Sequence, residues 1–415
     1  MKQMNIIVAM LAAFCFLSCD KADPIRNAEP GKSYELTKAQ SEMVEEGNIF
    51  AFDLLKAVSQ NKEFVGKDFM VSPLSISFVL GALDNGATGQ TSEEILDVLG
   101  FEGRTIEDIN EYSRNILHGC TEVDNLVDVE FANAVVVKEG YDFKDGFRNA
   151  LENYYDAFVR SMKFDDEAID AINDWCKEQT KGLIPEIIDK IPENARLFAL
   201  NSIYFKGAWE YKFEKEDTKK ESFTSIDGSS SKTWMMHMEG WLDYSSNDTW
   251  STVRLPYGNG SYSMYVLLPH EGISVDAVME GLDGKTWEIE KNRMRSCKVD
   301  LKLPRFETAS DINLIDIMIS LGMERAFYPD MAEFGDMFEN ESGIFLGILK
   351  QKSMIIVNEE GTEAAGVTLG GSMVTGFMPP ENKPQTFHAD RPFVYLIQEK
   401  SSNAIFFIGA KVSAE

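Results

Sequence analysis

The side chains that most often carry out chemistry in proteins are few in this sequence and lie far apart. Its four histidines form no HExxH pair, the commonest metalloprotease motif, and no GxSxG segment supplies a nucleophile elbow. Gly284-Lys285-Thr286 resembles the end of a phosphate-binding loop, but Met279 stands where that loop requires glycine. The cysteines lack zinc-ligand spacing. The sequence therefore predicts no metal and no cofactor, and nothing in it supports an enzyme.

A different pattern lies in residues 359–391, which are rich in glycine and contain three prolines between 379 and 384. A loop of this length inside a compact domain is usually functional. Side chains alternate between the two faces of a strand, so a strand formed here would sort them into two sets. With Thr362 facing inward, the inward set is uniformly small: Ala364, Gly366, Thr368, Gly370 and Ser372. Glu363 would then face solvent, and the alternation predicts a segment that can enter a sheet.

The elements that must position this loop mix helices and strands without regular alternation, which favours an α+β fold. Apolar residues at helical spacing follow Asn48, Ser72-Pro73 and Thr91, and four more segments are helical in pattern: 144–159, 167–179, 274–280 and 311–321. Strands are predicted at 129–137, 197–205, 250–257, 262–268, 297–303, 353–358, 393–398 and 404–412. No change in composition divides residues 46–415, which we interpret as one domain.

The N-terminus has the pattern of an export signal. Lys2 precedes the uncharged run from Ile6 to Leu17, which has the length of a signal-peptide core and is too short to span a bilayer. Leu17-Ser18-Cys19 resembles the bacterial lipobox, which implies a signal peptide at 1–18, a lipidated Cys19 and a tether over 19–45. The predicted location is the cell envelope, as an outer-membrane lipoprotein facing either the periplasm or the outside. The alternative is a plain secretory signal and an extracellular protein.

Charge and cysteine content restrict the partners. With 40 basic and 68 acidic residues the formal charge is −28, which argues against nucleic acid because phosphate binding needs clustered lysine and arginine. We interpret the charge as favouring solubility, with attraction of cationic proteins as a weaker reading. Cys120, Cys176 and Cys297 follow the signal, so at most one disulfide can form within the chain. We interpret all three as small, mostly buried apolar residues.

One run resembles a known family motif. Glu359-Glu360-Gly361-Thr362-Glu363-Ala364-Ala365-Gly366 is similar to the hinge of the reactive-centre loop in serpins, the serine protease inhibitor superfamily. Further segments resemble other serpin motifs, in the family's order: Ser72-Pro73-Leu74-Ser75-Ile76, Phe205-Lys206-Gly207-Ala208-Trp209, Leu303-Pro304-Arg305-Phe306 and Phe387-His388-Ala389-Asp390-Arg391-Pro392-Phe393. The resemblance covers roughly residues 46–413. It implies the serpin fold, with three β-sheets, about nine helices and an exposed reactive-centre loop at about 359–391.

The resemblance also implies a mechanism. Insertion of the reactive loop into a sheet is the established behaviour of this family. A target protease would cleave the loop, form a covalent acyl-enzyme complex and be trapped as the loop inserts, so this chain would act as a monomeric suicide substrate. Elastase-like or subtilisin-like serine proteases are the expected targets, and cysteine proteases are a further possibility. The alternative is a non-inhibitory serpin that acts as a binding module.

The scissile bond follows from the family's spacing. Counting forward from the hinge places it between Thr375 and Gly376, whereas counting back from Phe387 reaches the neighbourhood of Pro379, a poor substrate residue. Insertion length constrains the hinge side, so we prefer the first count. Four neighbours remain alternatives: Met373, Val374, Phe377 and Met378.

The resemblance assigns further residues to the control of sheet opening. Ser72, Ser75 and Asn201 match polar residues of the family's shutter, and Trp209 matches its breach tryptophan. Gln351 falls where the family usually has a histidine. Because glutamine both donates and accepts hydrogen bonds, it can replace that histidine in part, and the hydrogen bonding of the cluster stays open at this stage.

Overall fold

A computed structural model describes residues 34–193, 195–339, 343–362 and 383–414. Nine α-helices lie in these ranges: α1 Lys38–Gln60, α2 Pro73–Asp84, α3 Gly89–Leu99, α4 Ile106–Gly119, α5 Asp145–Tyr154, α6 Asp166–Gln179, α7 Val275–Gly281, α8 Gly284–Arg293 and α9 Ile315–Leu321. None of the described helices is both long and apolar enough to cross a membrane.

The strands are more numerous than the sequence pattern predicted. They are β1 Phe69–Val71, β2 Val127–Lys138, β3 Phe158–Met162, β4 Leu197–Ala208, β5 Lys219–Thr224, β6 Ser230–Ser246, β7 Trp250–Tyr257, β8 Tyr262–Pro269, β9 Arg295–Pro304, β10 Phe306–Asn313, β11 Leu346–Asn358, β12 Gly361–Thr362, β13 Gln385–His388, β14 Phe393–Glu399 and β15 Ile405–Lys411. The helix predicted at 311–321 begins only at Ile315, because the preceding residues complete β10.

Two hydrogen-bonded sheets contain these strands. One has six strands in the order β10-β11-β12-β4-β2-β3, and the other has nine, with β1-β15-β14-β8-β7-β6-β9-β13 as its path and β5 paired to β6. The sequence analysis expected three sheets, whereas the structure has two. The long strand β6 pairs with β7 at its C-terminal end and with β5 and β9 along the rest of its length. It therefore joins two of the three expected sheets into one. The mixed α+β fold is confirmed.

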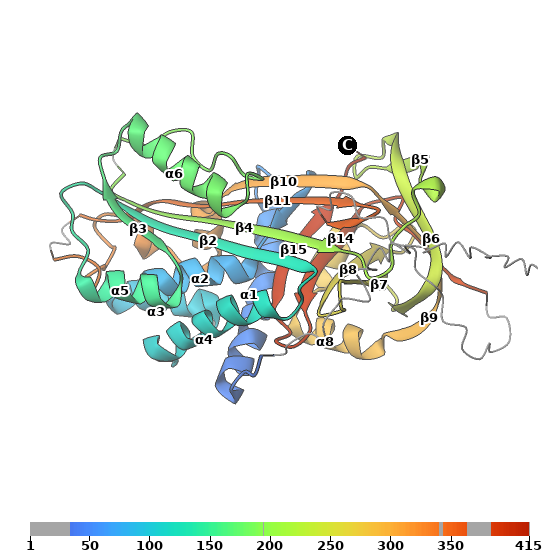
Figure 1. The fold of residues 1–415 in the computed structure, drawn as a ribbon, viewed down its shortest axis with the longest axis horizontal. Helices are drawn as coiled ribbons and strands as arrows, with labels where there is room; N and C mark the ends of the chain where they lie inside the picture. Colours follow the sequence, from blue (N-terminus) through green and yellow to red (C-terminus); the bar gives the residue numbers. More distant parts are fainter. Residues whose placement is uncertain (1–33, 194, 340–342, 363–382, 415) are drawn as a thin grey trace, which may run out of the picture.

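One face of the six-stranded sheet is covered along its length, whereas the other is covered mainly where α6 packs, because β10 alternates buried and exposed residues. In Figure 1 its long strands run across the molecule, with α6 above one end and α2, α4 and α5 below. The smaller apolar cluster, which includes Ile172 and Cys176 of α6 and Phe198 and Leu200 of β4, lies on the α6 side. The main core fills the space between the sheets and the remaining helices.

Helix α2 lies inside this core. All of its residues are buried, as expected for a helix that is apolar all round. Ser72 caps it by accepting a hydrogen bond from the Ser75 backbone N–H at 3.3 Å, and Pro73 occupies the first turn, where no amide hydrogen is needed. The predicted start of this helix is therefore correct. The sequence-based domain boundary at residue 46 falls inside α1, which begins at Lys38.

Candidate functional site

The six-stranded sheet is split at one end of its two central strands. β11 and β4 pair in parallel as far as Ser353 and Ile203. Four residues further along each strand, Val357 and Gly207 no longer pair with each other, because both pair with Thr362 of β12. The register is continuous across this change. The two strands therefore diverge just beyond Ser353 and Ile203, and the first residues of the hinge already fill the opening.

Gly361 is the residue that lets the chain enter this opening. Its φ is +144°, a conformation that other L-residues rarely adopt. A Cβ atom there would fall on the carbonyl oxygen of Gly207 and on Cα of Ala208. The next residue, Thr362, is 1% exposed, and its hydroxyl lies 2.6 Å from the Tyr257 hydroxyl. Thr362 therefore faces the core, which is the orientation that the sequence analysis assumed when it sorted the loop into two sets.

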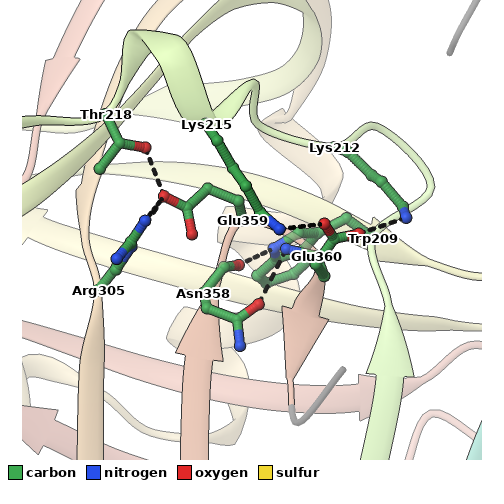
Figure 2. Close-up of polar contacts among 8 residues, drawn as sticks. All are labelled: Trp209, Lys212, Lys215, Thr218, Arg305, Asn358, Glu359 and Glu360. Atoms are coloured by element: carbon green, nitrogen blue, oxygen red, sulfur yellow. Dashed lines mark hydrogen bonds and ion pairs between the residues drawn. The ribbon is translucent and has the colours of Figure 1, made fainter. Parts of the chain in front are cut away.

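Glu359 anchors the turn before β12 (Figure 2). This side chain is 2% exposed, and its Oε1 atom accepts from the Thr218 hydroxyl at 2.6 Å, from Arg305 Nε at 2.8 Å and from a second Arg305 nitrogen. Burial opposes ionisation, but the hydrogen bonds from Arg305 and Thr218 outweigh it and hold the pKa of Glu359 below its ordinary value. The carboxylate is therefore ionised and well satisfied.

Glu360 makes a second ionic anchor on the adjacent residue. Its two oxygens lie 2.6 Å from Lys212 Nζ and 3.0 Å from Lys215 Nζ. Against the opposing effect of burial, these ammonium groups lower the pKa of Glu360. Figure 2 shows the two glutamates directed to opposite sides of the turn, one toward Arg305 and the other toward the two lysines. The turn is thus held from both sides by opposite charges.

Trp209 supports the turn through two hydrogen bonds and an aromatic stack. Its indole Nε1–H donates to the Asn358 carbonyl oxygen at 2.8 Å, and its backbone N–H donates to the Glu360 carbonyl oxygen at 3.0 Å. The ring stacks on Tyr257, with 4.4 Å between centroids and 13° between planes. Because Tyr257 also contacts Thr362, one aromatic stack supports both the turn and the inserted hinge residue.

A second polar cluster joins the paired part of β11 and β4 to α2. Gln351 and Asn201 face each other across the two strands. The Gln351 side chain accepts from the Ser72 backbone N–H at 2.8 Å, and its Nε2 donates to the Ser72 carbonyl oxygen at 3.1 Å and to Asn201 Oδ1 at 2.6 Å. Asn201 Nδ2 donates to Asn133 Oδ1 at 2.9 Å and to the Ser75 hydroxyl. Glutamine therefore uses both of its donors and its acceptor oxygen where the family usually has histidine.

The structure thus gathers the sequence-predicted residues into two groups. Ser72, Ser75, Asn201 and Gln351 form the cluster on the paired part of the sheet, and Trp209 lies with the first hinge residues at the split end. The other hinge residues, Glu363, Ala364, Ala365 and Gly366, lie outside the described residues, as does Cys19. So do the residues proposed around the scissile bond: Met373, Val374, Thr375, Gly376, Phe377 and Met378.

Several residues of the site were missed by the sequence analysis. Arg305 was quoted only as part of a strand-end motif, and Thr218, Lys212, Lys215 and Tyr257 were given no role. The one available signal was opposite charge: Lys212 and Lys215, close to Phe213, could pair with two consecutive glutamates of the hinge. Nothing in the sequence indicates that segments so far apart in the chain meet at the split end of the sheet.

The three cysteines of the described residues form no disulfide. Cys120 and Cys176 are buried, Cys297 is half-buried, and all three are free thiols. Burial raises the pKa of Cys176 to about 11, which keeps it as an unreactive thiol at neutral pH. Within the described ranges, no group of three or more histidine, cysteine or acidic side chains has an arrangement that could hold a metal ion.

A sheet that admits a loop between its two central strands defines a distinct class of protein. The family model for "Serpin (serine protease inhibitor)" matches residues 45–414, and the chain belongs to this family. Serpins are mostly protease inhibitors that act on target proteases, rather than catalysts.

Known relatives match along almost their whole length. Serpin B3 of Homo sapiens is 32% identical over 387 residues, which are 87% of this chain and 96% of that protein. Serpin-Z2A of Triticum aestivum is 30% identical over 380 residues, with 88% and 94% covered. Among solved structures, the thermophilic serpin tengpin in its native state has a TM-score of 0.83 at 27% identity and covers 94% of this chain and 99% of its own. Native protease nexin-1 with heparin gives 0.79 at 26%, covering 90% and 100%.

Proposed function

We propose that this chain inhibits a serine-type endopeptidase as a suicide substrate, by cleavage of its loop and insertion of the loop between β4 and β11. The observation that carries the proposal is β12, a strand of two residues already paired on both sides. In the reaction, the protease serine would attack the scissile carbonyl carbon and form an ester, and the C-terminal segment would leave as an amine. Insertion of the freed loop would then trap the ester.

The register of β12 indicates how insertion would continue. Glu363 would pair between Ile356 and Lys206, where both neighbours are half-buried and Lys206 offers an opposite charge. Ala364 would pair between Ile355 and Phe205, which are both buried, so only a small side chain fits the inward position. Gly366 would reach Ser353 and Ile203, where β11 and β4 still pair with each other.

Insertion beyond that point therefore requires the two strands to separate. The bond between Gln351 and Asn201 crosses the same boundary two residues further on, and it must break as the loop advances. The protein before cleavage would then be held in a kinetic trap rather than at its lowest free energy. This polar cluster would be part of the barrier.

The test uses the chain from residue 20 onward with an elastase-like serine protease, read by SDS gel and intact mass. The expected result is a covalent adduct that survives SDS, and the mass of the released C-terminal peptide should place the cut at Thr375-Gly376. Thr362→Arg puts a long charged side chain at a buried inward position, so this variant should be cleaved without forming an adduct. Thr362→Ser is the matched control and should keep the adduct. Clean cleavage of the unmodified protein by every protease class tried would refute inhibition.

The alternative, a binding module that does not inhibit, is distinguished by heating the cleaved protein. If the cleaved loop inserts, it adds a central strand and the thermal midpoint rises well above that of the intact protein. An unchanged midpoint would show that the loop does not insert. That result would favour the binding module even if cleavage were efficient.

We also propose that Cys19 is lipidated and attaches the monomeric protein to the cell envelope, at the outer membrane. The support is the lipobox-like Leu17-Ser18-Cys19 after an apolar run. Cys19→Ala should move the protein from the membrane to the soluble fraction, whereas Cys15→Ala, within the apolar run itself, should leave fractionation unchanged. Equal membrane association of Cys19→Ala and the unmodified protein would refute the anchor.

A further inference from the structure

Trp234 is an exposed aromatic residue that lies beside the anchor of the turn before β12. It belongs to β6, and 46% of its surface is accessible to solvent. It is part of neither apolar cluster of the core. The guanidinium carbon of Arg305 lies over its ring, 5.6 Å from the ring centre, and the Arg305 backbone N–H donates to the Trp234 carbonyl oxygen at 2.8 Å. The ring of Trp234 is therefore placed against the cation that binds Glu359.

Arg305 occupies a position where its side chain needs support. It is the single residue between β9, which ends at Pro304, and β10, which begins at Phe306. Its side chain is 39% exposed, although the Glu359 side chain that it binds is buried. An exposed arginine has many rotamers, so holding it in one of them costs conformational entropy. A flat aromatic surface restricts a guanidinium group and attracts its charge, so the ring reduces that cost.

The ring of Trp234 also attracts a second cation. Lys220 of β5 pairs directly opposite Trp234, and its Nζ atom lies 5.1 Å from the ring centre. Of the two cations, Arg305 is the one that donates to Glu359, through Nε at 2.8 Å and through a second nitrogen. Figure 2 shows Arg305 and Thr218 approaching Glu359 together. The contact between Trp234 and Arg305 thus links the nine-stranded sheet to the turn at the split end of the six-stranded sheet.

We propose that Trp234 is a positioning residue for the hinge, which holds Arg305 on Glu359 and so keeps β12 in the sheet. Without the ring, Arg305 would spend part of its time away from the carboxylate. Glu359 would then keep the Thr218 hydroxyl as its described side-chain donor. Because a buried carboxylate with too few donors is costly, the turn would open toward solvent.

This role has a consequence that rests on the proposed function. After the protease has formed its ester with the loop, insertion competes with hydrolysis, in which water attacks the ester carbonyl, frees the protease serine and leaves a carboxylate on the loop. A hinge already paired in the sheet gives insertion a start. Trp234→Leu should therefore increase the share of cleaved chains that carry no protease, while the rate of loop cleavage stays the same. An unchanged share in a variant whose turn opens more often would overturn this link to trapping.

Hydrogen exchange of the intact protein tests the positioning role without a protease. The backbone N–H groups of Trp209 and Phe213 donate to the carbonyl oxygens of Glu360 and Glu359, so a peptide covering residues 208–214 reports opening of the turn. Trp234→Leu keeps an apolar side chain but removes the ring, and exchange of these amides should become about twofold to fivefold faster, as expected from the strength of an exposed cation–ring contact. Trp234→Phe, which retains a smaller ring, should restore part of the protection.

Trp241→Leu is the matched control. Trp241 lies on the same strand, is 59% exposed and pairs opposite Lys298 rather than beside the turn, so its replacement should leave exchange of the peptide unchanged. Arg305→Gln keeps a donor for Glu359 but offers the ring no cation, so adding Trp234→Leu to it should change exchange little.

Three results would overturn the positioning role: unmodified exchange in Trp234→Leu, an equal increase in Trp241→Leu, or a full effect of Trp234→Leu in the Arg305→Gln background. Near-UV circular dichroism checks that each variant is folded. If the unmodified protein forms no protease adduct, the proposed inhibition fails, and the exchange measurements still decide the role of Trp234.

Discussion

Replacement of Gln351 by leucine would remove the amide that joins β11, β4 and the start of α2. Two buried groups would lose their partner in the described structure: the Ser72 backbone N–H and Asn201 Oδ1. The Ser72 carbonyl oxygen would keep a second bond, from the Ile76 N–H at 3.1 Å. Each buried polar group left without a partner costs about 1–3 kcal/mol, so the loss is about 2–6 kcal/mol.

Burial of the leucine side chain returns about 1–2 kcal/mol, which leaves a net destabilisation of about 3 kcal/mol. The thermal midpoint of the intact protein should therefore fall by about 3–4 °C, since the shift per kcal/mol shrinks as the chain lengthens. The bond to Asn201 crosses the boundary where β11 and β4 must separate, so the barrier to sheet opening should fall as well. Incubated at a fixed temperature without protease, Gln351→Leu should lose inhibitory activity several times faster than the unmodified protein.

Two variants serve as controls for this prediction. Gln351→His retains one donor and one acceptor and should fall between leucine and glutamine in both measurements. Ser353→Ala removes a buried bond of 3.0 Å to the Met70 carbonyl oxygen, which does not cross from β11 to β4. It should lower the midpoint without the same acceleration of activity loss. A leucine variant with the midpoint and lifetime of the unmodified protein would refute the reasoning.

Three further predictions concern the hinge and the core. Glu359→Gln should lower the free energy of unfolding by about 1–3 kcal/mol at pH 7. Because folding lowers the pKa of Glu359, the stability difference between this variant and the unmodified protein should shrink as pH falls below about 4. Thermal midpoints measured across this pH range test both statements. Burial raises the pKa of Asp84 to about 6, so the free energy of unfolding falls as pH rises from about 4 to 6. Asp84→Asn should therefore increase the free energy of unfolding by about 1–3 kcal/mol at pH 7.5 but not at pH 4, measured by denaturant titration. Gly361→Ala should expel β12 and increase exchange at Gly207, whereas Gly146→Ala, with open space at its Cβ, should not.

The strands that the sequence analysis predicted all have buried residues on one or both faces, although β1 and β10 share this burial and were missed. β4 and β14 read as apolar runs because both of their faces are covered. β5 and β6 were missed, since their exposed positions carry lysine, serine and threonine and leave no apolar period. β12 could not be predicted from local pattern at all. Its strand conformation depends on β4 and β11, which lie far away in sequence.

In the candidate site, too, local patterns could be read from the sequence, whereas contacts between distant segments could not. Side-chain alternation within one segment shows which loop residues share a face with Thr362, but that Thr362 itself faces the core is seen only in the structure. The anchors of Glu359 and Glu360 were missed because Arg305 and the two lysines come from other segments. Position 351 could be matched by counting from the hinge, but the three bonds of its glutamine depend on how α2 lies against the sheet.

The stack of Trp209 on Tyr257 gives the protein an optical signal of its own. The indole is 2% exposed, and its Nε1–H is bonded to the strand that precedes β12, so its emission depends on the conformation of the turn. Movement of the hinge would change the stacking and hydration of this ring and shift its fluorescence. Subtraction of a Trp209→Phe spectrum would isolate that signal from the other five tryptophans. Stopped-flow fluorescence could then follow loop entry in real time, with no label attached to the loop itself.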